Sequence, residues 1–240
     1  MEPRQRIIVA LDVDTKDKAV GLVQLLKDDV GAFKIGLELV NAEGLGIFDA
    51  VKTAGAPRVF YDAKFHDIPN TVAGAIRAAV KLGVWMINVH CSGGTDMMKA
   101  AVEAAQSEAS ALGLQPPKVI GVTLLTSIDQ RMLSAELRVT EPLEDYVTHL
   151  ARLAQQAGLD GIVASPQEVE LIRAACGPDF MIVTPGVRPK AFDTNDQKRV
   201  TIPREAVEKG ADFIVVGRPI TRANDPVAVA RAIAAELDGV

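Results

Sequence analysis

The chain contains the stretch Val59-Phe60-Tyr61-Asp62-Ala63-Lys64, a short apolar run that ends in two charged residues. A run of this length, rich in β-branched and aromatic residues, predicts a buried β-strand. The Ala-rich segment Thr71–Leu82 that follows carries apolar residues at helical spacing. Together the two segments predict one strand–helix unit, and the fold depends on how often this unit recurs.

The same unit recurs along the whole chain. Strands are predicted at Ile7–Asp12, Ala32–Gly36, Val59–Lys64, Met86–His90, Val119–Leu125, Gly161–Ala164, Met181–Pro185 and Phe213–Gly217. Helices are predicted at Lys16–Lys27, Thr71–Leu82, Thr95–Leu112, Leu143–Ala157, Glu168–Ala175, Arg204–Lys209 and Pro226–Leu237. Strands that alternate with helices predict a parallel sheet, and eight such units are the count that closes a barrel.

An open, doubly wound sheet is the competing architecture. Its GxGxxG fingerprint is absent after the first strand, where the chain reads Ala10-Leu11-Asp12-Val13-Asp14. No Pro/Gly-rich linker or shift in composition divides the sequence. We therefore expect an α/β protein of one domain, a (β/α)8 TIM barrel formed by residues 1–240.

The composition argues against several classes of function. The 240 residues carry a net charge of −5 and only 4% aromatic residues, which is unlike the basic, aromatic surface of a nucleic-acid-binding protein. The two cysteines, Cys91 and Cys176, have no CxxC spacing and are expected to be reduced thiols. No signal peptide and no membrane-spanning run is expected, so the predicted location is the cytoplasm.

Polar residues gather where the predicted strands end. Barrels of this kind carry their active sites at the C-terminal ends of the strands. The residues found there are Asp12, Lys34, Asp62, Lys64, Asn88, His90, Thr123, Thr126, Gly186, Arg188, Gly217 and Arg218. Surface solvation would scatter such residues over both ends of the barrel, so their placement predicts a functional site at one end.

The third strand carries the most informative pair of charges. Side chains alternate between the two faces of a strand, so Phe60, Asp62 and Lys64 should point into the barrel. Burying an Asp and a Lys is costly unless they are paired. Lys34 and Asp67 could complete a nearly neutral network that keeps the lysines protonated.

Simpler roles remain open for several of these residues. The Asp62–Lys64 pair could be a structural ion pair of the barrel. Asp67 could cap the helix that follows it. His66 is expected to be a packed or hydrogen-bonded loop residue, and no metal site is expected, because His90 and His149 lack a second ligand at a recognisable spacing.

A second cluster of residues is typical of a phosphate site. The segment Val215–Ile220 predicts a strand, a glycine turn and a short helix, an arrangement that presents backbone N–H groups to an anion. Arg218 adds a bidentate donor. The segment Thr184–Arg188 supplies the other half, and barrels commonly bind phosphate after strands seven and eight. Taken alone, either segment could be an ordinary turn.

At this point the sequence resembles a known family. The stretch Asp62-Ala63-Lys64-Phe65-His66-Asp67-Ile68-Pro69-Asn70-Thr71 is similar to the DxKxHDIPNT signature of the orotidine 5′-phosphate decarboxylases. The resemblance runs along nearly the whole chain. Further matches, each weak but in the right order, are Val9–Asp12, Phe33–Gly36, Asn88–His90, Val122–Ser127, Thr184–Pro189, Asp196–Arg199 and Val216–Ile220.

The resemblance implies a decarboxylase that acts on orotidine 5′-monophosphate in pyrimidine biosynthesis. It assigns to Lys64 the delivery of a proton to C6 of the pyrimidine as CO₂ leaves. Asp62 would sit beside the substrate carboxylate, and Lys34 would order the network and touch the ribose. Neither a metal nor a cofactor is implied.

The resemblance also implies a set of contacts with the substrate. Asp12 would hydrogen-bond a ribose hydroxyl, and Thr126 would approach the pyrimidine edge. The 5′-phosphate would be held by Arg188, Gln197, Gly217 and Arg218. The loop that joins the first two of these residues would close as a lid.

A homodimer with shared active sites is a further implication of the resemblance. Asp67, which belongs with the catalytic set, would reach the partner's site together with Ile68 and Thr71.

Two alternatives stay open. The first is a Mg²⁺-dependent sugar-phosphate decarboxylase or hexulose-phosphate synthase on the same barrel, which shares an Asp-x-Lys-x-x-Asp core. The second is a non-catalytic phosphate-binding barrel, because a fold does not imply a function.

Overall fold

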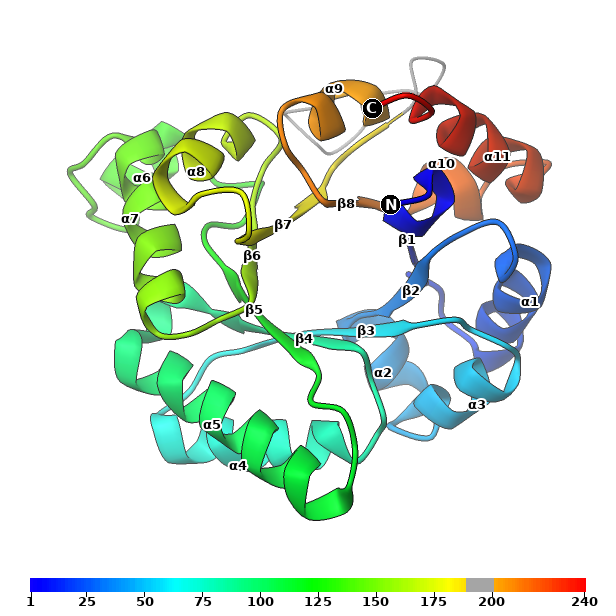
Figure 1. The fold of residues 1–240 in the computed structure, drawn as a ribbon, viewed down its shortest axis with the longest axis horizontal. Coiled ribbons are helices and arrows are strands. Elements are labelled where there is room, and N and C mark those ends of the chain that lie inside the picture. The colour runs from blue at the N-terminus through cyan, green and yellow to red at the C-terminus, as the bar shows by residue number, and fades with distance from the viewer. Residues whose placement is uncertain (189–200) are drawn as a thin grey trace.

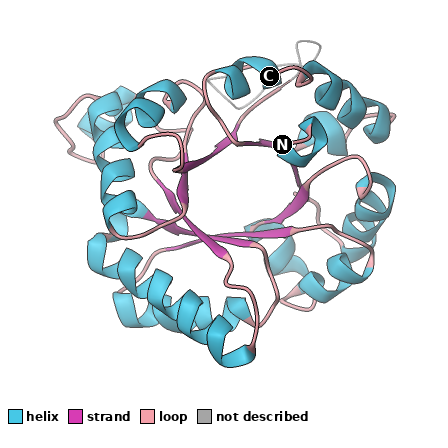
Figure 2. Ribbon diagram, viewed as in Figure 1, coloured by secondary structure: helices cyan, strands magenta, loops and turns pink. Residues whose placement is uncertain are grey.

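Eight parallel strands close into a barrel that is surrounded by helices (Figures 1 and 2). The computed structural model describes residues 1–188 and 201–240. The strands, which pair in chain order, are β1 (Ile7–Ala10), β2 (Ala32–Ile35), β3 (Val59–Phe65), β4 (Met86–His90), β5 (Lys118–Val122), β6 (Gly161–Val163), β7 (Met181–Pro185) and β8 (Phe213–Val216). β1 pairs with β8, which confirms the predicted (β/α)8 barrel.

Helices follow the strands and form the outer layer. They are α1 (Lys16–Leu26), α2 (Leu37–Glu43), α3 (Ile47–Thr53), α4 (Pro69–Val80), α5 (Thr95–Leu112), α6 (Gln130–Ala135), α7 (Leu143–Gln156), α8 (Val169–Cys176), α9 (Pro203–Glu208), α10 (Arg218–Thr221) and α11 (Pro226–Glu236), with 3₁₀ turns η1 (Pro3–Arg6) and η2 (Cys91–Gly93). No helix of the two described ranges is long and apolar enough to cross a membrane.

Three short helices were missed from the sequence. α2 and α3, each of seven residues, connect β2 to β3, and the six-residue α6 precedes α7. A helix of this length completes at most two turns, so its apolar residues do not repeat often enough to reveal the helical period. Glycines at Gly36, Gly44 and Gly46 also flank α2 and α3, which makes that connection resemble a loop in the sequence.

Some predicted strands were also too long. β5 ends at Val122 rather than Leu125, because the chain turns there and the N–H of Ile128 donates to the carbonyl of Leu125. β1 likewise ends at Ala10, two residues before Asp12. Asp12, Thr123 and Thr126 therefore lie on loops just beyond the sheet. The other charged and polar residues predicted for the first four strand ends lie inside the strands: Lys34, Asp62, Lys64, Asn88 and His90.

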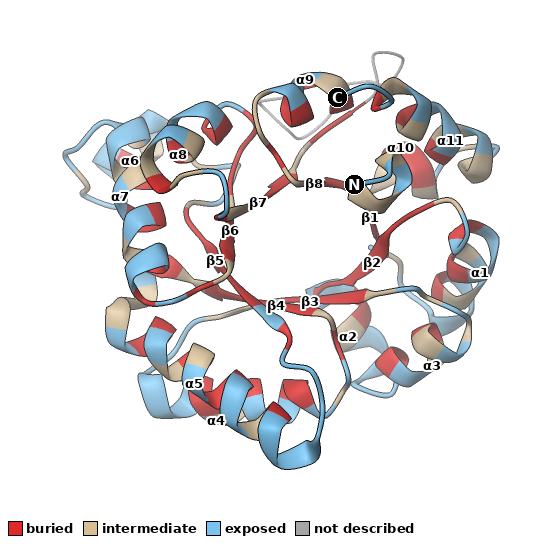
Figure 3. Ribbon diagram, in the orientation of Figure 1, coloured by how far each residue is buried: buried red, intermediate tan, exposed pale blue. Residues whose placement is uncertain are grey.

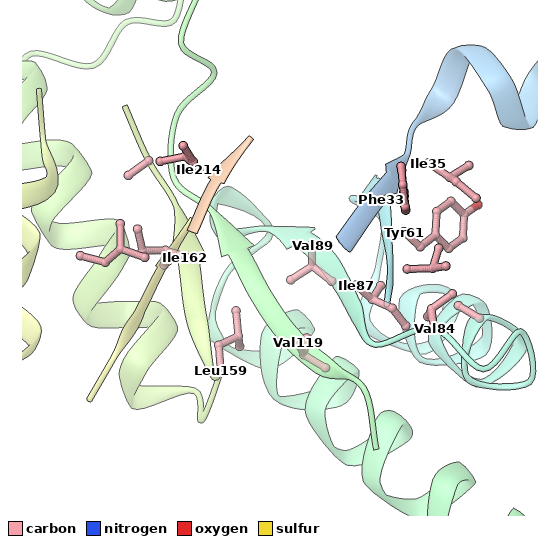
Figure 4. Packing of buried hydrophobic residues seen from close by; sticks show 14 of the residues in the cluster. Phe33, Ile35, Tyr61, Val84, Ile87, Val89, Val119, Leu159, Ile162 and Ile214 are labelled. Carbon is pink, nitrogen blue, oxygen red and sulfur yellow. The ribbon is translucent and has the colours of Figure 1, made fainter. Parts of the chain in front are cut away.

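The strands separate two apolar cores. Side chains inside the barrel form one small cluster, made of Ile8, Ala10, Ala32, Phe60, Met86, Ile120, Val183, Phe213 and Val215. The opposite faces of the strands pack against the helices in a much larger cluster (Figures 3 and 4). Phe60 lies in the inner cluster and Tyr61 in the outer one, where its ring meets that of Phe48 edge-on at 4.7 Å. The predicted faces of β3 are confirmed for these two residues.

A half-buried arginine, Arg58, lies at the floor of the barrel, at the N-terminal ends of the strands. The Arg58 guanidinium lies 4.3 Å from the Trp85 ring centroid and 5.5 Å from that of Phe213. It also donates to the backbone carbonyls of Gln5 and Gly31. Because aromatic rings and hydrogen-bonded guanidinium fill this end, the polar residues at the opposite end define the open mouth of the barrel.

Candidate active site

Four alternating charges form a continuous chain at the barrel mouth. Lys34, the last but one residue of β2, places its Nζ 3.0 Å from Asp12 Oδ1 and 3.3 Å from Asp62 Oδ2. Lys64 Nζ lies 2.7 Å from the other oxygen of the same carboxylate, Asp62 Oδ1. The order Asp12–Lys34–Asp62–Lys64 pairs every charge with at least one of opposite sign.

Burial makes this pairing necessary. Lys34 is 8% exposed and Asp62 is 9% exposed. Burial alone penalises the charged Asp62, but Lys34, Lys64 and hydrogen bonds from Lys64 and Asn88 outweigh it and hold the pKa of Asp62 below its ordinary value. Burial likewise works against the Lys34 ammonium, but Asp62 and Asp12 prevail and raise its pKa. Both groups are therefore charged at neutral pH.

Asp67 does not belong to this chain of charges within one protomer. It is exposed, its Oδ1 accepts the N–H of Ile68, and no ion pair joins it to a residue of the described ranges. The position expected for Asp67 in the network is taken by Asp12. The alternative that Asp67 caps α4 is wrong, because the N-cap residue is Ile68 and the helix start has no side-chain cap.

Asp67, Ile68 and Thr71 instead lie together on the outside of the barrel mouth. All three are exposed at the start of α4, and Ile68 is 66% exposed. A large apolar side chain in this position lies next to a carboxylate that has no charged partner in residues 1–188 and 201–240, so both groups are available to another molecule.

The backbone of β3 is irregular where it carries Lys64. Tyr61 is in register with Ile87 of β4, and Phe65 is in register with Val89. Between these two paired positions β3 contains two more residues than β4, which is a β-bulge. Lys64 has a φ of 51°, one of only two positive values among non-glycine residues of the described ranges. This left-handed backbone conformation is unfavourable for a residue with a Cβ. It persists only where contacts with neighbouring residues stabilise it, and such residues are often found at functional sites.

Asn88, which the sequence placed among the polar residues at strand ends without assigning it a role, contacts both charged residues of β3. Its side chain is fully buried, donates Nδ2–H to Asp62 Oδ1 at 2.6 Å, and accepts the Lys64 N–H on Oδ1 at 2.7 Å. The available signal was its position: a polar residue near the C-terminal end of a buried strand, on the face that points into the barrel.

The charge chain forms one wall of a cavity of about 400 Å³. Asp12, Lys34, Asp62 and Lys64 all line it. The lining on the side of β7 and β8 is made of residues from Pro185–Arg188 and Gly217–Pro219. The cavity thus joins the reactive charges to the predicted phosphate site, as expected from the order of these elements around the barrel.

Two glycines shape this cavity. A Cβ on Gly36 would lie 2.9 Å from Lys34 Nζ, so any side chain there would displace the ammonium from its two carboxylates. Gly217 is the N-cap of the short helix α10, as predicted, and Arg218 is the first residue of that helix. Arg188, at the end of the described range before residue 201, is buried.

Of the predicted substrate-binding residues in the described ranges, Ile68, Thr71 and Thr126 do not line this cavity. Thr126 is half-buried in the turn after β5, beyond the residues that line the cavity. Gln197, and with it the lid expected between Arg188 and Gln197, lies outside the described residues.

A smaller cavity of about 280 Å³ is lined by residues at and just beyond the C-terminal ends of β4 and β5. His66 and His90 line it, with ring centroids 5.3 Å apart. The pKa of His90 is lowered, mainly because burial disfavours the charged imidazolium and also because His66 and Lys64 repel a positive charge there. Within the described ranges, no group of three or more His, Cys, Asp or Glu residues is arranged to hold a metal ion.

Comparison with known proteins gives a consistent result. A model of the orotidine 5′-phosphate decarboxylase / HUMPS family matches residues 5–233. The orotidine 5′-phosphate decarboxylase of Moorella thermoacetica is 53% identical over all of this chain and 95% of its own length. That of Syntrophomonas wolfei is 49% identical over 99% of this chain and all of its own length.

Solved structures agree with the barrel. The crystal structure of orotidine 5′-phosphate decarboxylase from Lactobacillus acidophilus superposes with a TM-score of 0.85 at 37% identity, over 97% of this chain and 99% of that one. An uncharacterised conserved protein from Geobacillus kaustophilus gives 0.83 at 37% identity, over 97% and 100%.

The buried position of Lys34 predicts a stability change that depends on pH. Replacing it, as Lys34→Met, removes the cation between Asp12 and Asp62 and leaves Asp62 with Lys64 alone, and it should lower the free energy of unfolding by about 3 kcal/mol at pH 7. The lowered pKa of Asp62 contributes stability that is present above about pH 4 and is lost as the pH falls further. The raised pKa of Lys34 contributes stability that is lost only at strongly alkaline pH.

The difference between wild type and variant should therefore be largest at neutral pH and should shrink below about pH 4. Urea denaturation across this pH range measures it. Lys118→Met is the matched control, because Lys118 pairs with Asp160 at the other end of the barrel and is 48% exposed at its side chain. Equal losses in the two variants, or a difference that does not vary with pH, would contradict the proposed charge chain.

Proposed function

Because the chain belongs to the orotidine 5′-phosphate decarboxylase / HUMPS family, we propose that it converts orotidine 5′-monophosphate to uridine 5′-monophosphate and CO₂ in pyrimidine biosynthesis. One observation carries the assignment of the site. Lys64 Nζ is held 2.7 Å from Asp62 in the same cavity that Gly217 and Arg218 line. A ligand with a phosphate at one end and a reacting carboxylate at the other fits this arrangement of charges.

The phosphate end fixes the direction of the substrate. Arg188 and Arg218 provide cationic, hydrogen-bonding groups, and the backbone at Gly217 can approach an anion closely. We assign the 5′-phosphate to this side and, with it, Gln197. The ribose then lies over Asp12 and Lys34, and the pyrimidine lies over Lys64, with its far edge toward Thr126.

Lys64 supplies the central chemistry in this proposal. Breaking the bond between C6 and the carboxyl group releases CO₂ and leaves the electron pair on C6. A fixed ammonium stabilises that developing charge in a site that excludes water, and a proton passes from Lys64 Nζ to C6. The pairing of Lys64 with Asp62 keeps the ammonium protonated and in place before the reaction.

Asp62 and Lys34 act on this step through charge. An ionised Asp62 beside the substrate carboxylate repels it, and that repulsion disappears when neutral CO₂ leaves. Lys34 holds Asp62 from the other side and thereby limits its movement. We give stabilisation by Lys64 the larger share, because preorganised charge is usually the largest single contribution to catalysis.

The Mg²⁺-dependent alternative is disfavoured by Lys34. Its ammonium already lies between Asp12 and Asp62, where those two carboxylates would otherwise be available to a divalent cation. The non-catalytic alternative is disfavoured by the strained backbone at Lys64, since a simple phosphate-binding barrel has no need of it.

We further propose that two copies share their active sites. Asp67, Ile68 and Thr71 are exposed at the rim of the mouth, and Asp67 has no ion pair within its own described protomer. In a two-fold dimer these residues enter the partner's site, and Asp67 becomes a second carboxylate near the partner's Lys64. We place the enzyme in the cytoplasm, because Cys91 and Cys176 are both buried free thiols.

Decarboxylation is tested directly by absorbance. Adding orotidine 5′-monophosphate to the purified chain should lower the pyrimidine absorbance, and EDTA should leave the rate unchanged. Lys64→Ala should abolish the change, because it removes both the ammonium and the transferable proton. Lys52→Ala is the control, since Lys52 lies near the barrel floor and donates to the Leu82 carbonyl. Activity that survives in Lys64→Ala, or that EDTA removes, would refute the proposed mechanism.

Binding of the remote phosphate should contribute to the rate. Arg218→Ala should lower kcat/KM by roughly 30- to 4,000-fold, since losing one partner of a hydrogen-bonded charge pair costs about 2–5 kcal/mol. Part of the loss should be in kcat, because remote binding energy helps to hold the reacting groups in place. Steady-state kinetics measure both, with Arg222→Ala as the control, because Arg222 is exposed just after α10. Near-normal kcat/KM in Arg218→Ala would remove Arg218 from the phosphate site.

Shared sites can be tested by mixing two inactive variants. Lys64→Ala and Asp67→Ala should each be inactive, but each mixed dimer should contain one site with both residues intact. Equal mixing with subunit exchange should restore about a quarter of wild-type activity, because half of the dimers are mixed and each has one working site. If the mixture stays inactive although mixed dimers are present, Asp67 does not act across the interface.

A further inference from the structure

The side chain of Asn88 contacts both Asp62 and Lys64, the two charged residues of β3. It lies on β4, on the same face as Met86 of the inner barrel cluster, and its side chain has no exposure to solvent. Both polar atoms of its amide are used, and both partners belong to β3. Nδ2 donates to Asp62 Oδ1 at 2.6 Å, and Oδ1 accepts the backbone N–H of Lys64 at 2.7 Å.

The second of these bonds meets a need created by the bulge in β3. Between Tyr61 and Phe65 the register with β4 shifts, and a bulge removes a backbone N–H from the regular ladder. A buried N–H without an acceptor costs about 1–3 kcal/mol. The Asn88 side chain takes the place of the missing strand carbonyl for Lys64, and so holds Lys64 at its positive φ.

The first bond fixes the carboxylate. Asp62 Oδ1 accepts from both Lys64 Nζ and Asn88 Nδ2, while Oδ2 faces Lys34. Two cations alone would hold the carboxylate by charge, which has little directional preference. The amide N–H adds a directional contact from a rigid strand, so that the plane of the carboxylate is defined.

We propose that Asn88 is a positioning residue for the decarboxylation, which sets the relative placement of Asp62 and Lys64 through one amide without touching the substrate. The inference rests on the proposed function. It explains how the strained backbone at Lys64 is maintained, and how the ammonium is held against Asp62 at the wall of the cavity.

At neutral pH the amide meets both requirements, whereas an apolar side chain or an ionised carboxylate does not. A leucine has similar volume but leaves the Lys64 N–H and one Asp62 oxygen without partners. An ionised aspartate can accept from Lys64 N–H but cannot donate to Asp62, and it adds a like charge next to that carboxylate. The orientation of the amide is also defined. If it were flipped, Asn88 Oδ1 would face Asp62 Oδ1, and its Nδ2 would face the backbone N–H of Lys64.

Steady-state kinetics and product binding test the proposal in Asn88→Leu. We expect kcat to fall by roughly 100-fold, the scale that a misplacement of about 1 Å costs an enzyme. KM, and the Kd for uridine 5′-monophosphate, should stay within about threefold of wild type, because the phosphate and ribose contacts remain. A kcat within about threefold of wild type in Asn88→Leu would overturn the proposal.

A second variant supplies a readout that a purely structural role would not produce. In Asn88→Asp two carboxyl groups lie side by side, so one takes up a proton at a pH well above the usual range for aspartate. Once protonated, the new group can donate as the amide did. The kcat of this variant, divided by that of wild type, should therefore rise at least about fivefold from pH 8 to pH 5.

The kcat of Asn88→Leu, divided by that of wild type, should not change with pH. If Asn88→Leu does not fold, the Asn88→Asp ratio decides alone: a rise on acidification supports the proposal, and a flat ratio overturns it. Ile87→Val is the matched control, because Ile87 is a buried neighbour on β4 that faces the helices (Figure 4). It should lower stability while leaving kcat and its pH dependence unchanged.

Failure of the inference differs from failure of the proposed function. The wild-type chain is measured first with orotidine 5′-monophosphate, and no turnover there would refute the function itself. Turnover by wild type, together with near-normal kcat in Asn88→Leu, would refute only the role of Asn88.

Discussion

The buried carboxylate of Asp62 is the constraint on which the rest of the mouth depends. A lone charge at this depth would be protonated or would destabilise the barrel, so the structure surrounds it with Lys34, Lys64 and the amide of Asn88. Each of these comes from a strand next to Asp62 or from its own strand. Closing the barrel is therefore what brings the compensating groups together, and the site exists only in the folded chain.

The arrangement around Asp62 also includes a strained backbone at Lys64, which indicates a functional role. A structural ion pair could be satisfied without a left-handed residue, yet Lys64 is held at a φ of 51° by a bulge and by Asn88. Strain of this kind persists where the surroundings over-determine it, and it places the ammonium beside the cavity rather than in the sheet. The opposite end of the barrel, closed by Arg58 and its aromatic neighbours, has no such irregularity among the residues described and serves stability.

The division of labour around the mouth follows the order of the strands. The charge chain comes from β2, β3 and the loop after β1, and the groups proposed for phosphate follow β7 and β8. One small ligand can therefore bridge the two sides of a cavity of about 400 Å³. In this proposal the phosphate contributes binding energy far from the reacting carbon, where it can stabilise the placement of Lys64. In the same proposal the exposed Asp67 acts in the site of the partner subunit rather than in its own.

The sequence by itself determined the architecture and most of the chemistry, because eight apolar runs alternating with helical segments specify a closed parallel barrel and period-two geometry turns Phe60 inward and Tyr61 outward. Local pattern could not reveal helices as short as α2, α3 and α6. Nor could it show that Asp12, rather than Asp67, completes the charge chain within a protomer, or that Asn88 links Asp62 to Lys64. Those outcomes depend on strand register and on a bulge, which arise from the packing of strands distant in sequence and leave no periodic signal along the chain.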